Sequence, residues 1–123
     1  MAHGSFVWNE LVTPDVAQAT RFYEETLGWQ IERIDGSFGS YWMARAGGTP
    51  VAGILDAKVS PIGGAPRWFT YLEVDDIDRR VADAAARGGK VLRAPFDAPG
   101  VGRIALIADA TGAEMGWMTP EKR

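Results

Sequence analysis

The chain offers few side chains that could carry out catalysis or hold a metal. It has 123 residues, of which none is cysteine and only one is histidine. Thiol nucleophiles, disulfides, zinc–thiolate sites and iron–sulfur clusters are therefore excluded. The single histidine, His3, lies in an N-terminal segment that we expect to be frayed. An imidazole base or a set of imidazole ligands is not expected either.

Carboxylate, phenol and guanidinium groups remain as candidates. Glu10 and Glu114 are the acids best suited to act as a general base, although solvated or ion-paired carboxylates are commoner at such positions. Tyr71 is a weaker candidate, as a proton donor. Arg67 and Arg103 carry guanidinium groups that could bind an anionic substrate through paired hydrogen bonds, although arginines at protein surfaces are common.

Two other patterns have a structural explanation. Gly47-Gly48 and Gly63-Gly64 lack the strand–loop–helix context and the lysine of a phosphate-binding loop, so they are interpreted as turns. The acidic run Asp75-Asp76-x-Asp78 lacks the continuation of a calcium-binding loop. It is interpreted as the cap of a helix.

The elements that would position these residues follow the same order in both halves of the chain. Thr13-Pro14-Asp15 supplies a cap, a first-turn proline and an early acid, and Gly28 stands where the helix should end. In the second half, Asp75 or Asp76 is predicted to cap the start of the helix, and Gly88-Gly89 is predicted to end it. The predicted helices cover 14–27 and the segment from 77 to Gly88, and the predicted strands cover 6–12, 29–34, 38–44, 51–55, 68–74, 90–93, 103–108 and 113–118.

The order βαβββ therefore occurs twice. Sliding the chain along itself superposes Leu11 on Leu72, Val16 on Ile77 and Gly28 on Gly89 at a single offset of 61 residues. Near the end the offset becomes 63, which sets Gly53 on Gly116. The halves are interpreted as duplicates within one domain of residues 1–123, with module one at about 5–56, a connector at about 57–66 and module two at about 67–119.

Charge and hydropathy exclude two classes of partner. The formal net charge is −3 and the sequence pI is about 5.1, so nothing attracts the chain to a phosphate backbone and no nucleic acid is expected. No apolar run is long enough for a membrane helix, and the N-terminus has no features of a signal peptide. We expect a cytoplasmic protein that does not bind membranes.

Several motifs, in this order and spacing, resemble a known family. They are Asn9-Glu10-Leu11-x-Thr13-x-Asp15, Phe22-Tyr23, Leu27-Gly28-Trp29, Val74-Asp75-Asp76-Ile77, Gly88-Gly89-Lys90-Val91, Pro99-Gly100-Val101-Gly102-Arg103 and Asp109-x-Thr111-Gly112. Together they resemble the vicinal oxygen chelate superfamily of glyoxalases, bleomycin-resistance proteins and extradiol dioxygenases, particularly its glyoxalase-like bacterial members. The resemblance implies an α+β fold of two tandem βαβββ modules, whose curved mixed sheet encloses a cleft and whose helices lie outside.

The same resemblance indicates where a metal would bind. In metal-using members of the family, the first and last strands of each module supply His, Gln or Glu ligands. The matching positions here hold Trp8, Gly53, Phe69 and Gly116, none of which can coordinate a divalent ion through its side chain. We therefore expect a cleft with no metal and no cofactor, in which the two glycines leave open space.

Strand alternation then selects the residues that would line this cleft. If Trp8 faces the cleft, Phe6 and Glu10 on the same strand face it too, because side chains two residues apart share a face. The same alternation turns Arg67, Phe69 and Tyr71 toward the cleft. On the last strand, Glu114 shares the face of Gly116. The resulting aromatic surface suits a small aromatic or partly apolar molecule. Trp8 and Phe69 could instead be core residues.

Three functions remain open. The first is a metal-free small-molecule-binding protein like the bleomycin-resistance branch, the second is a lyase, dioxygenase or isomerase with a non-standard metal set, and the third is a protein-interaction module. The absent ligands favour the first and third, and the aromatic surface favours the first over the third. The connector would also permit a homodimer with exchanged modules.

Overall fold

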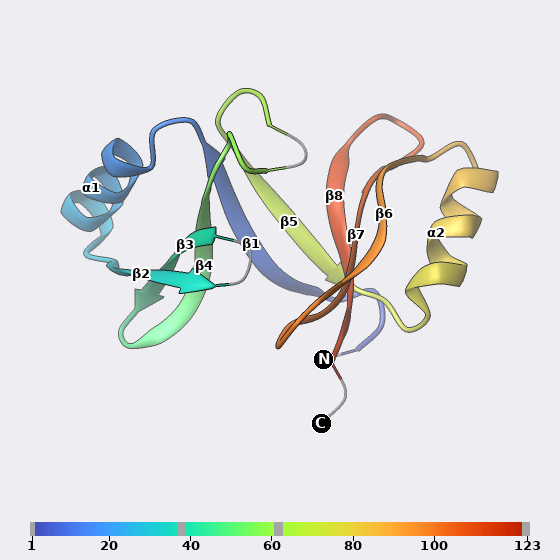
Figure 1. Ribbon diagram of the computed structural model, residues 1–123, viewed down its shortest axis with the longest axis horizontal. Helices are drawn as coiled ribbons and strands as arrows, with labels where there is room; N and C mark the ends of the chain where they lie inside the picture. Colours follow the sequence, from blue (N-terminus) through green and yellow to red (C-terminus); the bar gives the residue numbers. More distant parts are fainter. Residues whose placement is uncertain (1, 37–38, 61–62, 122–123) are drawn as a thin grey trace. The chain divides into compact units, whose positions relative to one another are not determined.

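The computed structural model describes residues 2–36, 39–60 and 63–121, and it confirms the repeated βαβββ order of an α+β fold (Figure 1). The elements are β1 (Phe6–Thr13), α1 (Val16–Leu27), β2 (Gln30–Gly36), β3 (Gly39–Ala46), β4 (Thr49–Asp56), β5 (Arg67–Glu73), α2 (Ile77–Ala86), β6 (Lys90–Ala98), β7 (Gly102–Ala108) and β8 (Glu114–Pro120). Phe38, where a strand was expected to begin, and Pro61 of the connector lie outside the described residues.

The strands of each repeat follow the same pairing scheme. In the first repeat the order is β2-β3-β4-β1, and in the second it is β6-β7-β8-β5. Hairpins make the antiparallel pairs, whereas the first and last strands of each repeat pair in parallel. Parallel neighbours need a long crossover, which the helix and the two intervening strands supply.

Packing divides the chain into two compact units whose boundaries differ from those of the sequence repeat. One unit is Asn9–Trp68, called the N-unit below, and the other is Met1–Trp8 with Phe69–Arg123, called the C-unit. Backbone hydrogen bonds attach the first residues to the C-unit. The N–H of Gly4 donates to the carbonyl of Glu73 at 2.7 Å, and the N–H of Glu73 donates to the carbonyl of Ser5 at 2.8 Å.

The helix of the N-unit begins two residues later than its sequence indicated. Asp15, not Thr13, is the N-cap of α1, because its carboxylate accepts the N–H of Gln18 at 3.0 Å. Thr13 supports this cap, since its hydroxyl accepts the N–H of Asp15 at 3.2 Å. Gly28 ends the helix as predicted, with the left-handed φ of 69° that favours glycine.

The helix of the C-unit differs slightly from the prediction at its end. The sequence left Asp75 and Asp76 as alternative N-caps, and the structure shows that the cap is Asp76. Its carboxylate accepts the N–H of Arg79 at 3.3 Å. The repeat set Gly28 on Gly89, but the residue with the left-handed φ, of 91°, is Gly88, one position earlier. The following N–H, of Gly89, donates to the carbonyl of Ala84 at 2.8 Å.

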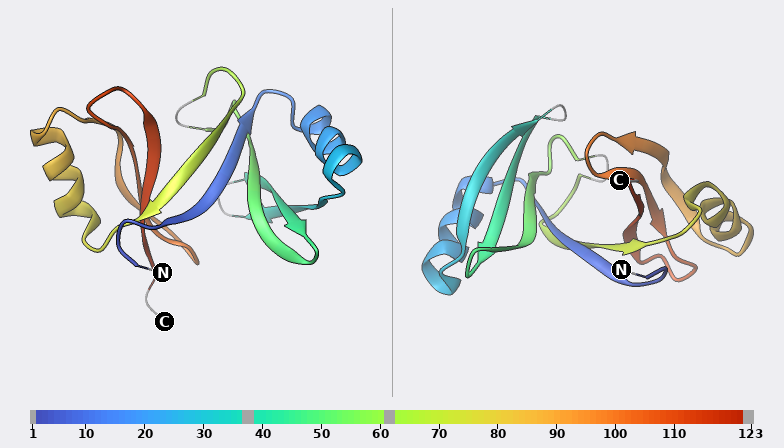
Figure 2. Two further views of the ribbon diagram at one scale, coloured as in Figure 1. Left: turned by 180° about the vertical axis from the view of Figure 1, so that it is seen from behind. Right: turned by 90° about the horizontal axis from the view of Figure 1, so that it is seen from below.

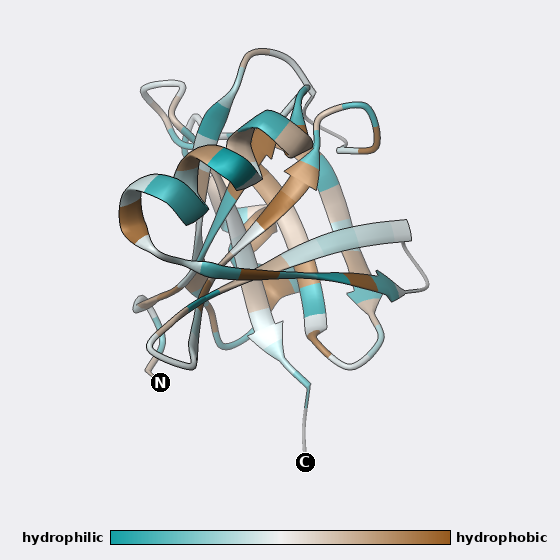
Figure 3. Cartoon of the chain, turned by 90° about the vertical axis from the view of Figure 1, so that its left-hand side faces the viewer, coloured by the Kyte–Doolittle hydropathy of each residue, from teal (hydrophilic) through white to brown (hydrophobic). Residues whose placement is uncertain are grey.

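The two helices pack very differently. In the C-unit, α2 buries Ile77 and Val81 in a core that includes Val74, Ala105 and Ile107. Figure 2 shows α2 alongside the sheet strands that it contacts. In contrast, α1 has no buried residue, although it carries large apolar side chains, and hydrophobic and hydrophilic stretches alternate along it (Figure 3). None of the described helices is long and apolar enough to cross a membrane.

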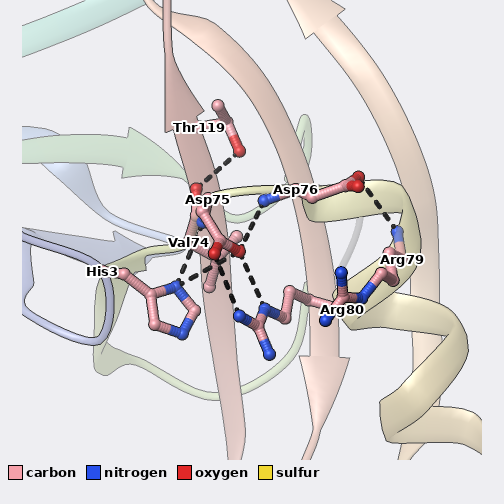
Figure 4. A network of polar contacts seen from close by, with 7 residues as sticks. All are labelled: His3, Val74, Asp75, Asp76, Arg79, Arg80 and Thr119. Carbon is pink, nitrogen blue, oxygen red and sulfur yellow. Dashed lines mark hydrogen bonds and ion pairs between the residues drawn. The ribbon is translucent and has the colours of Figure 1, made fainter.

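His3 is docked and not frayed, contrary to the prediction. Its Nδ1 accepts the N–H of Asp75 at 3.1 Å, and the carboxylate of Asp75 binds the guanidinium of Arg80 through two bonds of 2.8 and 3.0 Å (Figure 4). The segment is ordered because the strand pairing of Gly4 and Ser5 brings the imidazole to this corner. Hydrogen bonds from Arg80, and then from the N–H of Asp76, hold the pKa of Asp75 well below its usual range.

This network predicts a pH-dependent effect of Asp75→Asn. Because the pKa of Asp75 is lower in the folded than in the unfolded chain, its contribution to stability is present above the unfolded pKa of about 3.9 and is lost as the pH falls below it. The variant should therefore have a lower free energy of unfolding than the parent at pH 7, and the difference should shrink below about pH 4. Denaturant unfolding across this pH range measures the difference, with Glu25→Gln on α1 as the control. A difference between the parent and Asp75→Asn that stayed constant with pH would contradict the lowered pKa of Asp75.

Candidate functional site

In the N-unit, a tyrosine covers Gly53, which the sequence resemblance predicted to stand at a family ligand position. Gly53 on β4 pairs with Glu10 of β1 and with Met43 of β3. Tyr41 lies two residues before Met43 on β3, so its ring is on the same face of the sheet. A Cβ added to Gly53 would overlap the phenol of Tyr41, whose hydroxyl is the nearest group.

The C-unit repeats this arrangement with a tyrosine from a different strand. Gly116 on β8 pairs with Tyr71 on β5, and a Cβ added to Gly116 would overlap the ring of Tyr71. Phe69 packs edge to face against Tyr71, with ring centroids 5.5 Å apart, and is only 2% exposed. The expectation that the two glycines leave open space is therefore wrong, because a tyrosine side chain occupies the space next to each glycine.

The residues at these positions do not fit a divalent cation. Indole, phenyl and glycine offer no donor, and within 2–36, 39–60 and 63–121 no three His, Cys, Asp or Glu side chains come together as a metal site. Of the two acids that the sequence analysis selected, Glu10 lies on the sheet face of Gly53. Glu10 is 9% exposed. One carboxylate is too few ligands for a divalent cation.

The two candidate arginines both have partners in the structure. Arg103 binds the carboxylate of Asp78 through two bonds of 3.0 Å and that of Asp97 through one bond of 3.1 Å. These bonds raise the pKa of Arg103 and lower that of Asp78. Arg67 donates to the carbonyls of Gly63 and Ala65, at 2.7 and 3.3 Å, and so braces the connector. An anionic substrate would compete with these contacts, and binding by either arginine stays a prediction.

The other predicted site residues lie in different environments. Phe6 is 63% exposed, and Glu114 is exposed at the start of β8. Trp8 is half-buried, and its carbonyl accepts the hydroxyl of Thr70 at 3.4 Å. Their roles in ligand binding remain predictions, as does that of Phe69.

Sequence reasoning missed Tyr41 and an aromatic cluster in the N-unit. The alternation of side chains along β3 would have identified Tyr41 only if the register between β3 and β4, which carries Gly53, had been known. In the cluster, Tyr23 stacks on Trp29 with centroids 5.1 Å apart, and Trp68 Nε1 donates to the hydroxyl of Tyr23 at 3.3 Å. A pocket of about 370 Å³ beside them is lined by Asn9, Trp29, Val51, Ala52 and Trp68.

The two tyrosine–glycine contacts predict unequal effects of adding a methyl group. Gly116→Ala should lower the free energy of unfolding by about 1 to 3 kcal/mol, because the new Cβ meets ring atoms close to the backbone of Tyr71. Gly53→Ala should cost less, since it meets the movable tip of Tyr41. Denaturant melts test this, and in a Tyr71→Ala background the cost of Gly116→Ala should fall. An equal cost in both backgrounds would contradict the contact.

Known structures share the architecture. The methylmalonyl-CoA epimerase of Streptomyces coelicolor has a TM-score of 0.68 at 16% identity, over 98% of this chain and 100% of the epimerase chain. A hypothetical protein of Bacillus halodurans has a TM-score of 0.69 at 14% identity, over 99% of this chain and 98% of its own. These identities show the fold alone.

Sequence relatives lie in actinobacteria. CFP32 of Mycobacterium tuberculosis, described as a putative glyoxylase, is 39% identical over 121 residues, which are 95% of this chain and 44% of CFP32. The anthracycline biosynthesis protein DnrV of Streptomyces peucetius is 32% identical over 125 residues, covering 91% of this chain and 46% of DnrV. The chain thus spans less than half the length of these relatives. Residues 5–115 match the family model, and the chain belongs to the Glyoxalase/Bleomycin resistance protein/Dioxygenase superfamily.

Proposed function

We propose that this protein binds a small, flat, partly apolar organic molecule through aromatic side chains on its sheets, without a divalent cation. The observation that carries the proposal is the pairing of Tyr41 with Gly53 and of Tyr71 with Gly116. Phenol rings cover the last-strand positions at which metal-using members of the superfamily carry ligands. The chemistry of these surfaces is that of ring stacking and hydrogen bonding.

The residues around each pair support this class of ligand. In the C-unit, Trp8 and Tyr71 are both partly exposed, and Tyr71 is supported from within by the buried ring of Phe69. In the N-unit, the pairing of Glu10 with Gly53 puts Glu10 on the sheet face over which the Tyr41 ring lies. Apolar walls with a few placed polar groups are typical of small-molecule sites.

The names of two relatives guide the choice of ligand. DnrV of S. peucetius and DauV of a Streptomyces strain, at 32% and 31% identity, are both named anthracycline biosynthesis proteins. Anthracyclines are flat, fused-ring aromatic molecules with carbonyl and hydroxyl groups. A dihydroxyanthraquinone is therefore a suitable first probe for stacking on the aromatic residues.

A catalytic function has one specific observation in its favour. Glu10 is a 9% exposed carboxylate on the sheet face that also carries Tyr41, and a buried acid next to a phenol could exchange a proton with a bound substrate. Under this alternative, Glu10→Gln would abolish turnover while leaving ligand affinity within a few fold. Under simple binding, no turnover would be seen in the parent protein.

The absence of donors predicts that the purified protein binds its ligand without a metal. Elemental analysis and native mass spectrometry should find less than stoichiometric Zn, Ni, Mn or Fe, and a chelator should leave affinity for the anthraquinone probe unchanged. The proposal would be overturned if the parent protein held about one metal ion per chain and if Glu10→Gln or Glu114→Gln lost that ion. The same mass spectra would report a retained ligand and any homodimer.

The aromatic residues should dominate the affinity. Truncating an aromatic anchor commonly costs on the order of 2 kcal/mol, whereas an exposed charge costs well under 1 kcal/mol. Trp8→Ala should therefore weaken binding of the probe by about thirtyfold. Fluorescence titration measures this loss.

Two variants serve as controls for the effect of Trp8→Ala. Trp42→Ala removes an indole from β3 at a position alternate to Tyr41, and it should leave the affinity of the folded protein nearly unchanged. Phe69→Ala should lower the melting temperature, because Phe69 is almost fully buried. If Trp8→Ala melts much earlier than the parent yet binds the probe as tightly, Trp8 is a core residue and not part of the site.

A further inference from the structure

The pocket of the N-unit lies on the sheet face opposite to the contact between Tyr41 and Gly53. Asn9 directly precedes Glu10 on β1, and Ala52 directly precedes Gly53 on β4, so their side chains point to the other face of the sheet. The volume of about 370 Å³ is within the range of small-molecule sites. The lining residues are Asn9, Trp29, Val51, Ala52 and Trp68, all of which belong to the N-unit.

Two indole rings form perpendicular walls of this pocket. The ring planes of Trp29 and Trp68 are 88° apart, and their centroids are separated by 6.0 Å. Aromatic rings prefer to contact one another either offset-stacked or edge to face. A flat ring that stacks on one of these indoles would meet the other indole edge to face. The corner between the two tryptophans therefore suits a flat aromatic ligand.

Tyr23 of α1 supports both walls, although it does not itself line the pocket. Its ring stacks on Trp29 with centroids 5.1 Å apart, and its hydroxyl accepts the N–H of Trp68 Nε1 at 3.3 Å. Trp68 is 44% exposed, so burial alone does not fix its indole, and the hydrogen bond to Tyr23 does. Walls that are held in place before binding lose less conformational entropy when a ligand arrives.

Asn9 provides a polar group for recognition. Trp68 already donates its N–H to Tyr23, and Val51 and Ala52 have no polar side-chain atoms. The carboxamide of Asn9, which is an exposed residue, carries an acceptor oxygen beside two N–H donors. Such a group can form two hydrogen bonds with a ligand edge on which an N–H stands next to a carbonyl. This edge is that of a lactam.

The charge of the walls narrows the class of ligand further. Among the residues that the structure describes, no ionisable side chain lines this pocket. A charged ligand would lose water here without gaining a counter-charge, which costs free energy. The pocket therefore favours a neutral ligand.

We propose that this pocket is a second binding site, which takes an uncharged flat heterocycle with a lactam edge. The ring packs in the corner between Trp29 and Trp68, and the lactam N–H and carbonyl pair with the carboxamide of Asn9. The inference does not rest on the proposed function, because its residues lie on the opposite face of the N-unit sheet.

A matched pair of probes tests the two hydrogen bonds. Carbostyril is a benzene ring fused to a lactam, and N-methylcarbostyril differs only in lacking the N–H. Asn9 is the single asparagine of the chain, so the loss of one side-chain amide signal in Asn9→Ala assigns it in ¹H–¹⁵N spectra. Carbostyril should shift this signal in a saturable manner and bind about threefold to tenfold more tightly than N-methylcarbostyril.

Asn9→Ala also tests the origin of the preference between the probes. Without the carboxamide, carbostyril and N-methylcarbostyril should bind equally well, as followed by the indole signal of Trp68, which Trp68→Phe assigns. A preference that came only from the size of the added methyl group would persist in Asn9→Ala.

Removing one wall tests the location of the site. Trp68→Ala should weaken binding of both probes by at least about fivefold, because ring stacking on an aromatic side chain is lost. The matched control is Trp8→Ala, which removes an indole from the C-unit and should leave carbostyril binding unchanged. Thermal melts report whether each variant is folded. If Trp68→Ala does not fold, the Asn9→Ala comparison decides.

The proposal is overturned by any of three results: no saturable shift of the Asn9 signal, an unchanged preference for carbostyril in Asn9→Ala, or unchanged binding in folded Trp68→Ala. Loss of carbostyril binding in Trp8→Ala alone would also overturn it, because the probe would then occupy the site of the proposed function. Trp68→Ala should leave affinity for the anthraquinone probe unaltered, so the two proposals can fail separately.

Discussion

The parallel pairing of the first and last strands in each repeat is the constraint on which the site depends. In the N-unit it sets Glu10 opposite Gly53, and in the C-unit it sets Tyr71 opposite Gly116. Parallel strands cannot be joined by a tight turn, so the helix and the two intervening strands must lie between them in sequence. A shift of this register by one residue would move Glu10 away from Gly53 in the N-unit and Tyr71 away from Gly116 in the C-unit.

Glycine at the centre of a strand normally weakens it, because it has no side chain to pack and loses more backbone freedom on folding. In both units the missing side chain leaves room that a tyrosine occupies, since a Cβ on either glycine would overlap it. The two rings come from different strands, β3 in one unit and β5 in the other. Different residues of the two copies therefore occupy the same kind of space, next to a glycine of the last strand.

The helix side of the sheet has diverged further between the two copies. The N-unit has the cluster of Tyr23, Trp29 and Trp68 beside a pocket of about 370 Å³, and α1 itself has no buried residue. The C-unit packs α2 closely through Ile77 and Val81 but leaves a pocket near the C-terminal end of the helix. The helix sides of the two units thus present different chemical environments.

The sequence by itself determined the order of the elements and, in outline, the two glycines that end the helices. These features follow from local patterns of apolar residues, caps and residue types, which need no knowledge of distant contacts. Tertiary structure decided which strands are neighbours and in what register, and hence that tyrosines cover Gly53 and Gly116, that His3 docks on Asp75 and that acids occupy Arg103. Each of these contacts joins residues from separate elements, so their closeness depends on strand pairing that no local pattern encodes.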